Sequence, residues 1–441
     1  MTPPFIKGGK YVKDFIMKEF QKIEISQGVD LISVPATRFK TNEISISFVA
    51  PLSEKTAAAN ALLAHLITQT TRSCPSVSQF NRKLAMLYGA SIYAGVSKLG
   101  ENQCITLEAS CLDDRFALGD ERISSELFSF LCELVFDVKL DENGSFFEED
   151  IARVKRILIE KIESEENDKR IFALRRLEST MFENEPYGVN RFGSKGSINA
   201  ATSDDLKNAL SYLINNSKIQ ITVVGNADIQ AIAKTAKYYF DSVSRSYIAP
   251  KGSVFIGRAE SSKTVVDKMD VKQGKLVLGF RVDEQSEFES NAKMRLFCDI
   301  FGGGPYSKLF ANVREKLSLC YYCSARYDRR KSSIIIQCGC EEENMDKAVS
   351  EILNQLDEIK KGNIDDELSA SKMAIEDLIN SVYDDSISLV NWYSSQLCDK
   401  KILSPADSVS ENKRVTKEGI ISAASLLSLD TIYKLVKREV E

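Results

Sequence analysis

The sequence predicts an α+β fold in which two homologous units follow one another along the chain. Three observations indicate this fold: alternating apolar segments typical of half-buried strands, segments with helical apolar spacing, and the same order of both in each half. With 441 residues, 43% of them hydrophobic, the chain is long enough to form more than one core. We predict an N-terminal unit at residues 1–245 and a C-terminal unit at residues 246–441.

Each copy of the repeat is predicted as a strand, two helices, two strands and a helix. In the first copy these elements cover residues 43–50, 55–70, 77–88, 91–97, 103–111 and 123–136. In the second copy they cover residues 274–282, 287–301, 306–316, 319–327, 333–340 and 345–359. The spacing from Phe48 to Tyr88 differs by one residue from that between Phe280 and Tyr321, so the register is nearly kept.

The segment between the two copies carries three further signals. A long helix is predicted from near Phe146, because its apolar residues recur three and four apart. Those residues are Ile151, Val154, Leu158 and Ile162. Loops are predicted at residues 184–188 and 193–196, and a buried strand at 219–225. Residues 241–257 are rich in serine, proline and glycine, which is typical of a linker.

Composition excludes several classes of function. The net charge of −5 argues against a nucleic-acid-binding protein, because phosphate recognition needs a concentrated basic surface. No segment has the apolar length that spans a bilayer, and residues 1–20 lack the apolar core of a signal peptide. The ten cysteines are dispersed, mostly in apolar segments, which favours reduced and buried thiols. We therefore expect a soluble, cytoplasmic protein with neither a nucleic acid nor a membrane as partner.

One group of cysteines has a spacing similar to that of a four-thiolate zinc ribbon. It consists of Cys320 and Cys323, followed by Cys338 and Cys340. Both pairs fall in predicted strands, where successive side chains alternate between faces. Cys320 and Cys323 are therefore expected to point to opposite faces, and we expect no metal here. A metal site is the alternative that the spacing leaves open.

The most specific segment reads Gly302-Gly-Gly-Pro-Tyr-Ser-Lys-Leu-Phe-Ala-Asn-Val-Arg-Glu-Lys-Leu-Ser-Leu-Cys-Tyr321. Three glycines before a helix allow another backbone to approach closely and leave amide N–H groups free near the positive helix end. A plain helix-entry turn with exposed charges gives the same pattern. Both interpretations stay open on this segment alone.

The segment resembles the C-terminal signature of the insulinase, pitrilysin and mitochondrial-processing-peptidase family of inverzincin metallopeptidases. That signature is a glycine-rich turn, then Leu-Phe, Arg-Glu-Lys and Leu-x-Tyr. The family's strand ending in Val-Val-Gly is matched at residues 223–225, and its Pro-Tyr-Gly loop at residues 186–188. The resemblance implies two α/β-sandwich units of the metallopeptidase LuxS/processing-peptidase-like fold, each an antiparallel-rich sheet covered by helices.

The same resemblance implies that the peptidase zinc site is lost. The family binds zinc with an inverted His-x-x-Glu-His motif on one helix and a glutamate on a later helix. His65 is the single histidine of the chain and aligns with the second histidine, while Ala61 and Ala64 replace the first histidine and the catalytic glutamate. Lys161 falls at the third ligand, with Glu160 one residue away. The resemblance, nearest to zinc-less bacterial members, thus implies a non-peptidase homologue without a metal of its own.

The other half of the family's site is retained in identity and spacing. Related enzymes use an arginine and a tyrosine, seven residues apart, to bind substrate and stabilise the oxyanion of the tetrahedral intermediate; Arg314 and Tyr321 match them. The resemblance assigns substrate binding to Gly302, Gly303 and Gly304. It implies a heterodimer in which a zinc-bearing homologous peptidase supplies the metal and peptides or small proteins are the substrate.

Two other functions remain as alternatives. The first is a structural or assembly scaffold derived from the same peptidase family, for which Arg314 and Tyr321 only pack at a helix-to-strand corner. The second is an active peptidase with an unusual metal site, which conflicts with Ala61 and Ala64.

Overall fold

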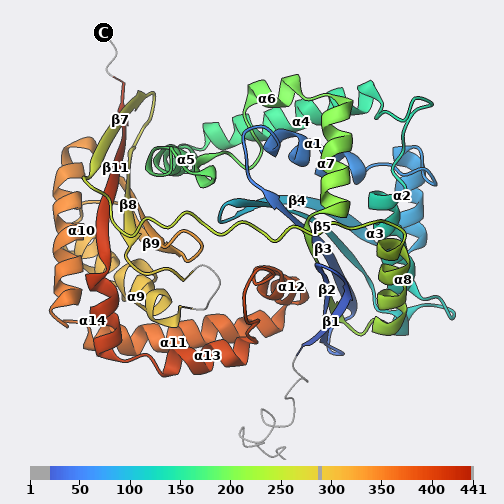
Figure 1. The fold of residues 1–441 in the computed structure, drawn as a ribbon. Helices are drawn as coiled ribbons and strands as arrows, with labels where there is room; N and C mark the ends of the chain where they lie inside the picture. The colour runs from blue at the N-terminus through green and yellow to red at the C-terminus, as the bar shows by residue number, and fades with distance from the viewer. Residues whose placement is uncertain (1–19, 287–290, 439–441) are drawn as a thin grey trace, which may run out of the picture.

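The computed structural model describes residues 20–286 and 291–438 and contains two sheets, each covered by helices (Figure 1). The first sheet is six-stranded and is formed by residues between 21 and 225. Its strands, in spatial order, are β1 (Gln21–Ser26), β2 (Val29–Pro35), β6 (Lys218–Gly225), β3 (Thr41–Pro51), β5 (Asn102–Leu112) and β4 (Ser91–Leu99). Only the β2–β6 pair is parallel.

The second sheet is five-stranded and is formed by residues between 263 and 437. Its strands, in spatial order, are β7 (Lys263–Met269), β11 (Leu427–Lys437), β8 (Gly274–Val282), β10 (Ser333–Cys340) and β9 (Tyr322–Asp328). Here too one pair is parallel, β7 with β11. The strands β2 to β6 correspond in order to β7 to β11, including the last strand inserted beside the first, so the internal repeat is confirmed in topology.

Helices cover both sheets. The first half contributes α1 (Ala57–Ile67), α2 (Val77–Met86), α3 (Ile123–Phe136), α4 (Glu148–Asn167), α5 (Lys169–Met181), α6 (Lys195–Ala200), α7 (Ser203–Asn215) and α8 (Ile229–Asp241). The second half contributes α9 (Ala292–Gly302), a π-helix at Leu309–Lys316, α10 (Met345–Lys360), α11 (Asp365–Ser381), α12 (Ser386–Ser394), α13 (Pro405–Lys413) and α14 (Lys417–Ser425). Antiparallel-rich sheets under helices confirm the predicted fold class.

The two halves exchange one helix each. On β3, Ile44, Ile46 and Phe48 enter the first core, while the intervening serines face the other way. That polar face is covered by α12 of the second half, where Gln220 of β6 donates a hydrogen bond to the Tyr393 carbonyl at 3.1 Å.

In return, α5 of the first half packs on β8 and β11 of the second sheet (Figure 1). Gly279 of β8 permits this approach, because a Cβ there would lie 2.5 Å from the Met181 sulfur. The exchange joins the two halves through both sheets.

Several predicted elements need comment. The loop expected at residues 193–196 instead opens α6, which Ser194 caps through the N–H of Ser197. The helix expected from residue 287 is seen from Ala292, and residues 287–290 lie outside the described part of the chain, as do residues 1–19 of the segment judged for a signal peptide. Among the described residues, no helix combines the length and apolar character needed to cross a bilayer.

Candidate functional site

Helix α1 carries the remnant of the zinc motif inside the first core. Its Ala61 and Ala64 side chains are completely buried, and they offer methyl groups where the family has a histidine and a glutamate. His65 is half-buried, and its Nε2 atom has no hydrogen-bond partner among the described residues. On this face of α1, the His65 imidazole is therefore the one group that could bind a metal ion.

Lys161 on α4 lies near that imidazole, as the alignment with the family's third ligand predicts. Burial, together with the positive charge of Lys161, lowers the pKa of His65. Glu160 does not replace the missing ligand, since its exposed carboxylate lies 3.9 Å from Arg156 on the solvent side of the helix. A single imidazole beside an ammonium group does not fit a Zn²⁺ site, because zinc needs three or more ligands and a cation repels it.

The three glycines predicted to bind substrate end α9. A Cβ on Gly302 would lie 2.6 Å from the backbone N of Ala325, so this glycine lets α9 pack directly on β9. A Cβ on Gly303 would lie 2.1 Å from the Asp299 carboxylate, and one on Gly304 would lie 2.7 Å from the Tyr306 ring. Gly302 thus has a packing reason against backbone, the contacts of Gly303 and Gly304 are with side chains, and Gly303 also lines a cavity.

The cavity has a volume of about 730 Å³ and lies between α9, β9, α11 and α12. Its lining includes the apolar side chains of Ile379 and Trp392 and an ion pair between Arg330 and Asp399 at 2.5 Å. The volume is within the range of small-molecule binding sites, but the eight charged residues among the lining are more than the small number of polar groups typical of such sites.

Arg314 and Tyr321 lie outside the lining of this cavity; Tyr321 is exposed, whereas Arg314 is partly buried. The Arg314 guanidinium lies 4.5 Å from the centre of the Phe310 ring, and the arginine side chain is 39% exposed. Tyr321 is 62% exposed, and its hydroxyl donates a hydrogen bond to Glu341 at 3.4 Å. Arg314 also pairs with the neighbouring Glu315 at 3.4 Å, so each of the two side chains has its own carboxylate partner.

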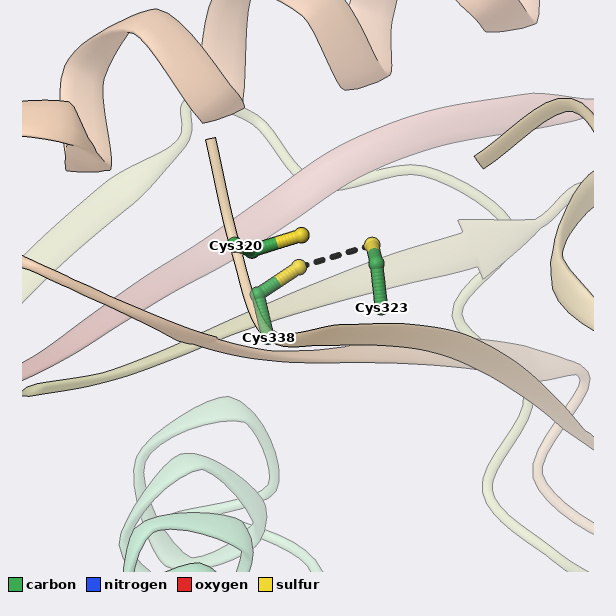
Figure 2. Close-up of side chains that lie close together, drawn as sticks. All are labelled: Cys320, Cys323 and Cys338. Carbon is green, nitrogen blue, oxygen red and sulfur yellow. Dashed lines mark hydrogen bonds between the residues drawn. The ribbon is translucent and has the colours of Figure 1, made fainter. Parts of the chain in front are cut away.

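The prediction that Cys320 and Cys323 point to opposite faces is wrong. Strand β9 begins only at Tyr322, so the alternation that applies to Cys323 does not extend to Cys320. Cys323 lies directly opposite Cys338 in the β9–β10 pair, and the sulfur atoms of all three cysteines point toward one another (Figure 2). Hydrogen bonds from the Cys323 and Cys338 thiols, with the nearby positive charge of Arg314, lower the pKa of Cys320 to about 4.

A buried ionic network that sequence reasoning missed joins the two halves. Lys331, in the β9–β10 turn, is fully buried and donates to Glu101 of the first half at 2.5 Å and also to Glu185. The Pro-Tyr-Gly loop lies beside it, and its Tyr187 hydroxyl donates to Asp328 at 2.7 Å. Buried charges of this kind are tolerated only when paired, so the loop motif has a structural role here.

Comparison with known proteins supports the resemblance. Residues 200–374 match the family model described as Peptidase M16 inactive domain. The chain is 29% identical over 406 residues to the probable inactive metalloprotease YmfF of Bacillus subtilis, covering 91% of this chain and 94% of that protein.

Solved structures agree in fold. A conserved protein from Enterococcus faecalis V583 is 25% identical, with a TM-score of 0.87 over 96% of this chain and 100% of the other. A peptidase M16 inactive domain from Pseudomonas fluorescens superposes with a TM-score of 0.75 at 16% identity, over 96% of this chain and 99% of the other.

Proposed function

Because the chain belongs to the M16 peptidase family as an inactive homologue, we propose that it is the non-catalytic subunit of a heterodimeric zinc peptidase. Its zinc-bearing homologous partner cleaves peptides or small proteins. The observation that carries this proposal is the contrast between the two halves of the family's site. Its zinc half is filled by Ala61, Ala64 and Lys161, whereas Arg314 and Tyr321 are kept, with a partly exposed and an exposed side chain respectively.

In this proposal the chain contributes substrate binding and oxyanion stabilisation. Arg314 pairs with Glu315 and the Tyr321 hydroxyl donates to Glu341, each at 3.4 Å, and in the proposal both side chains exchange these solvent-side carboxylates for a scissile bond held by the partner's zinc. Donors aimed at a developing oxyanion are worth about 3 kcal/mol each in transition-state stabilisation. In the proposal, the glycine turn at residues 302–304, which ends α9, binds the substrate backbone.

The proposal places the heterodimer in the cytoplasm. All ten cysteines are free thiols, and nine of them are buried. So many reduced thiols are typical of a protein in the cytoplasm, where glutathione and thioredoxin keep cysteines reduced.

The first test is whether the heterodimer forms. The full chain is mixed with the homologue from the same genome that retains His-x-x-Glu-His, and the molar mass of the product is measured by light scattering after size-exclusion chromatography. The proposal requires a one-to-one complex. Two separate species would contradict it.

A peptide-cleavage assay on the same complex addresses the scaffold alternative. A scaffold forms complexes without changing the partner's cleavage rate, so a complex whose peptide cleavage is insensitive to Arg314 and Tyr321 supports the scaffold function instead.

A further inference from the structure

Three buried thiols meet at the start of the β9–β10 hairpin. The sulfur atoms of Cys320, Cys323 and Cys338 all lie within 4.8 Å of one another, and those of Cys323 and Cys338 are 2.8 Å apart (Figure 2). The residues are 8%, 6% and 0% exposed, respectively. They come from two segments, because Cys320 precedes β9 while Cys338 lies in β10.

This arrangement has the chemistry of a metal site. Thiolate ligands select Zn²⁺ and Cu⁺ among the common biological cations. A zinc–sulfur bond is about 2.3 Å long, so sulfur atoms in a tetrahedral or trigonal set around one ion lie about 4 Å apart. The Cys323 and Cys338 sulfur atoms, at 2.8 Å, separate by about 1 Å when they take up the ion. We propose that Cys320, Cys323 and Cys338 bind one thiophilic d¹⁰ cation, Zn²⁺ or Cu⁺, as a tris-thiolate site.

The surroundings suit such an ion. Each thiol that binds the cation releases its proton to solvent, and the three thiolates give the site a net negative charge with either ion. Arg314 is near enough to act electrostatically on Cys320 and offsets part of that charge. The expectation of no metal at these cysteines depended on Cys320 and Cys323 pointing to opposite faces, which the structure does not show.

The position of the site gives the ion a structural purpose. Tyr321 lies between two of the ligands, and its backbone N–H donates to the Gly339 carbonyl at 2.8 Å. An ion held by Cys320, Cys323 and Cys338 ties this segment to β10 and holds Tyr321 in place. Metal binding itself does not depend on the proposed function, and only this consequence for Tyr321 rests on it.

The test is metal binding by the full chain, reduced and kept free of oxygen. Cd²⁺ serves as the spectroscopic probe, because its thiolate complexes absorb in the ultraviolet in proportion to the thiolates bound. Zn²⁺ and Cu⁺ are then titrated separately against chromophoric chelators to decide which cation is preferred. We expect one ion per chain. Cys320→Ser and Cys338→Ala are expected to weaken binding more than about tenfold, since even lost outer contacts cost that much.

The matched control is Cys298→Ala, which removes another buried thiol of the same core and is expected to bind like the unchanged chain. Circular dichroism of each variant checks folding, and Cys320→Ser decides where the more deeply buried substitutions fail to fold. The proposal is overturned if the reduced chain binds none of the three cations stoichiometrically, or if Cys320→Ser binds as tightly as Cys298→Ala. A chain that binds no metal and instead forms a Cys323–Cys338 disulfide in air also overturns it, in favour of a redox pair.

Discussion

Lys161 on α4 places a positive charge near the imidazole of His65 on α1. Burial and this charge together lower the pKa of His65, so the folded chain favours the neutral imidazole more than the unfolded chain does. In zinc-bearing members of the family, the resemblance places two metal ligands at these positions. The local electrostatics are therefore the reverse of those of a zinc site, in which ligands must attract a divalent cation.

Replacing the lysine tests this relationship directly. Lys161→Met is expected to raise the pKa of His65, because it removes the repelling charge while leaving the imidazole buried. NMR titration measures this without ambiguity, since the chain has one histidine. Lys155→Met is the control, because it removes a lysine from the same helix whose ammonium donates to the Asn199 carbonyl at 2.8 Å and whose charge does not act on His65. An unchanged His65 pKa in Lys161→Met would contradict the assignment.

The lowered pKa of His65 also predicts a pH dependence of stability. The unfolded chain binds the His65 proton near the ordinary pKa of 6.5, whereas the folded chain binds it only at lower pH. Between these values the unfolded state holds more protons, so stability falls as the pH drops from about 6.5. His65→Gln removes this share, and its urea-unfolding free energy is expected to fall less between about pH 7.5 and about pH 5.5 than that of the unchanged chain. Equal losses in both chains would refute the prediction.

Gly302 is expected to tolerate no side chain. Gly302→Ala places a methyl group 2.6 Å from the Ala325 backbone N, where α9 meets β9. Overpacking of this kind costs about 1–3 kcal/mol of unfolding free energy. Gly95→Ala is the control, because the nearest atom to its Cβ is 4.0 Å away in an open strand. Urea unfolding of both variants compares their free energies of unfolding. Equal values would contradict the prediction, because they would show that α9 and β9 move apart to accept the methyl group at little cost.

Lys331 is expected to be the most sensitive charged residue between the two halves. Lys331→Met leaves Glu101 and Glu185 buried without their shared cation and is expected to cost about 3–5 kcal/mol. Lys263→Met is the control, since its pair with Glu183 is half-exposed and worth at most about 1 kcal/mol. Thermal unfolding of both variants measures the difference. A Lys331→Met chain as stable as the control would show that the network does not hold the halves together.

Much of the fold follows from local sequence patterns. The alternation of Ile44, Ile46 and Phe48 with serines marks a strand with two different faces, and β3 has that form. The strand β11 was not predicted, because Asp430 interrupts its apolar alternation where the register with β8 shifts. That this segment is a strand depends on its pairing with β7 and β8, which lie far away in the sequence.

The site was harder to predict for a similar reason. The facing of Cys320 depends on where β9 begins, and strand ends are set by hairpin pairing rather than by residue type. The ion pair of Lys331 with Glu101 joins residues from the two halves of the chain, so spacing in the sequence does not reveal it. The lysine near His65 was found from sequence because the family alignment supplied the pairing of α1 with α4.

The most direct test of the central claim is peptide cleavage by the zinc-bearing homologue, with and without this chain. The account predicts that cleavage requires the chain, and that Arg314→Ala/Tyr321→Phe lowers kcat/KM by at least about a hundredfold while the complex still forms. Tyr238→Phe, which changes another exposed tyrosine, is the control and is expected to support full cleavage. If the homologue cleaves equally well alone, or the double variant supports full activity, the claim that this chain completes its partner's site is contradicted.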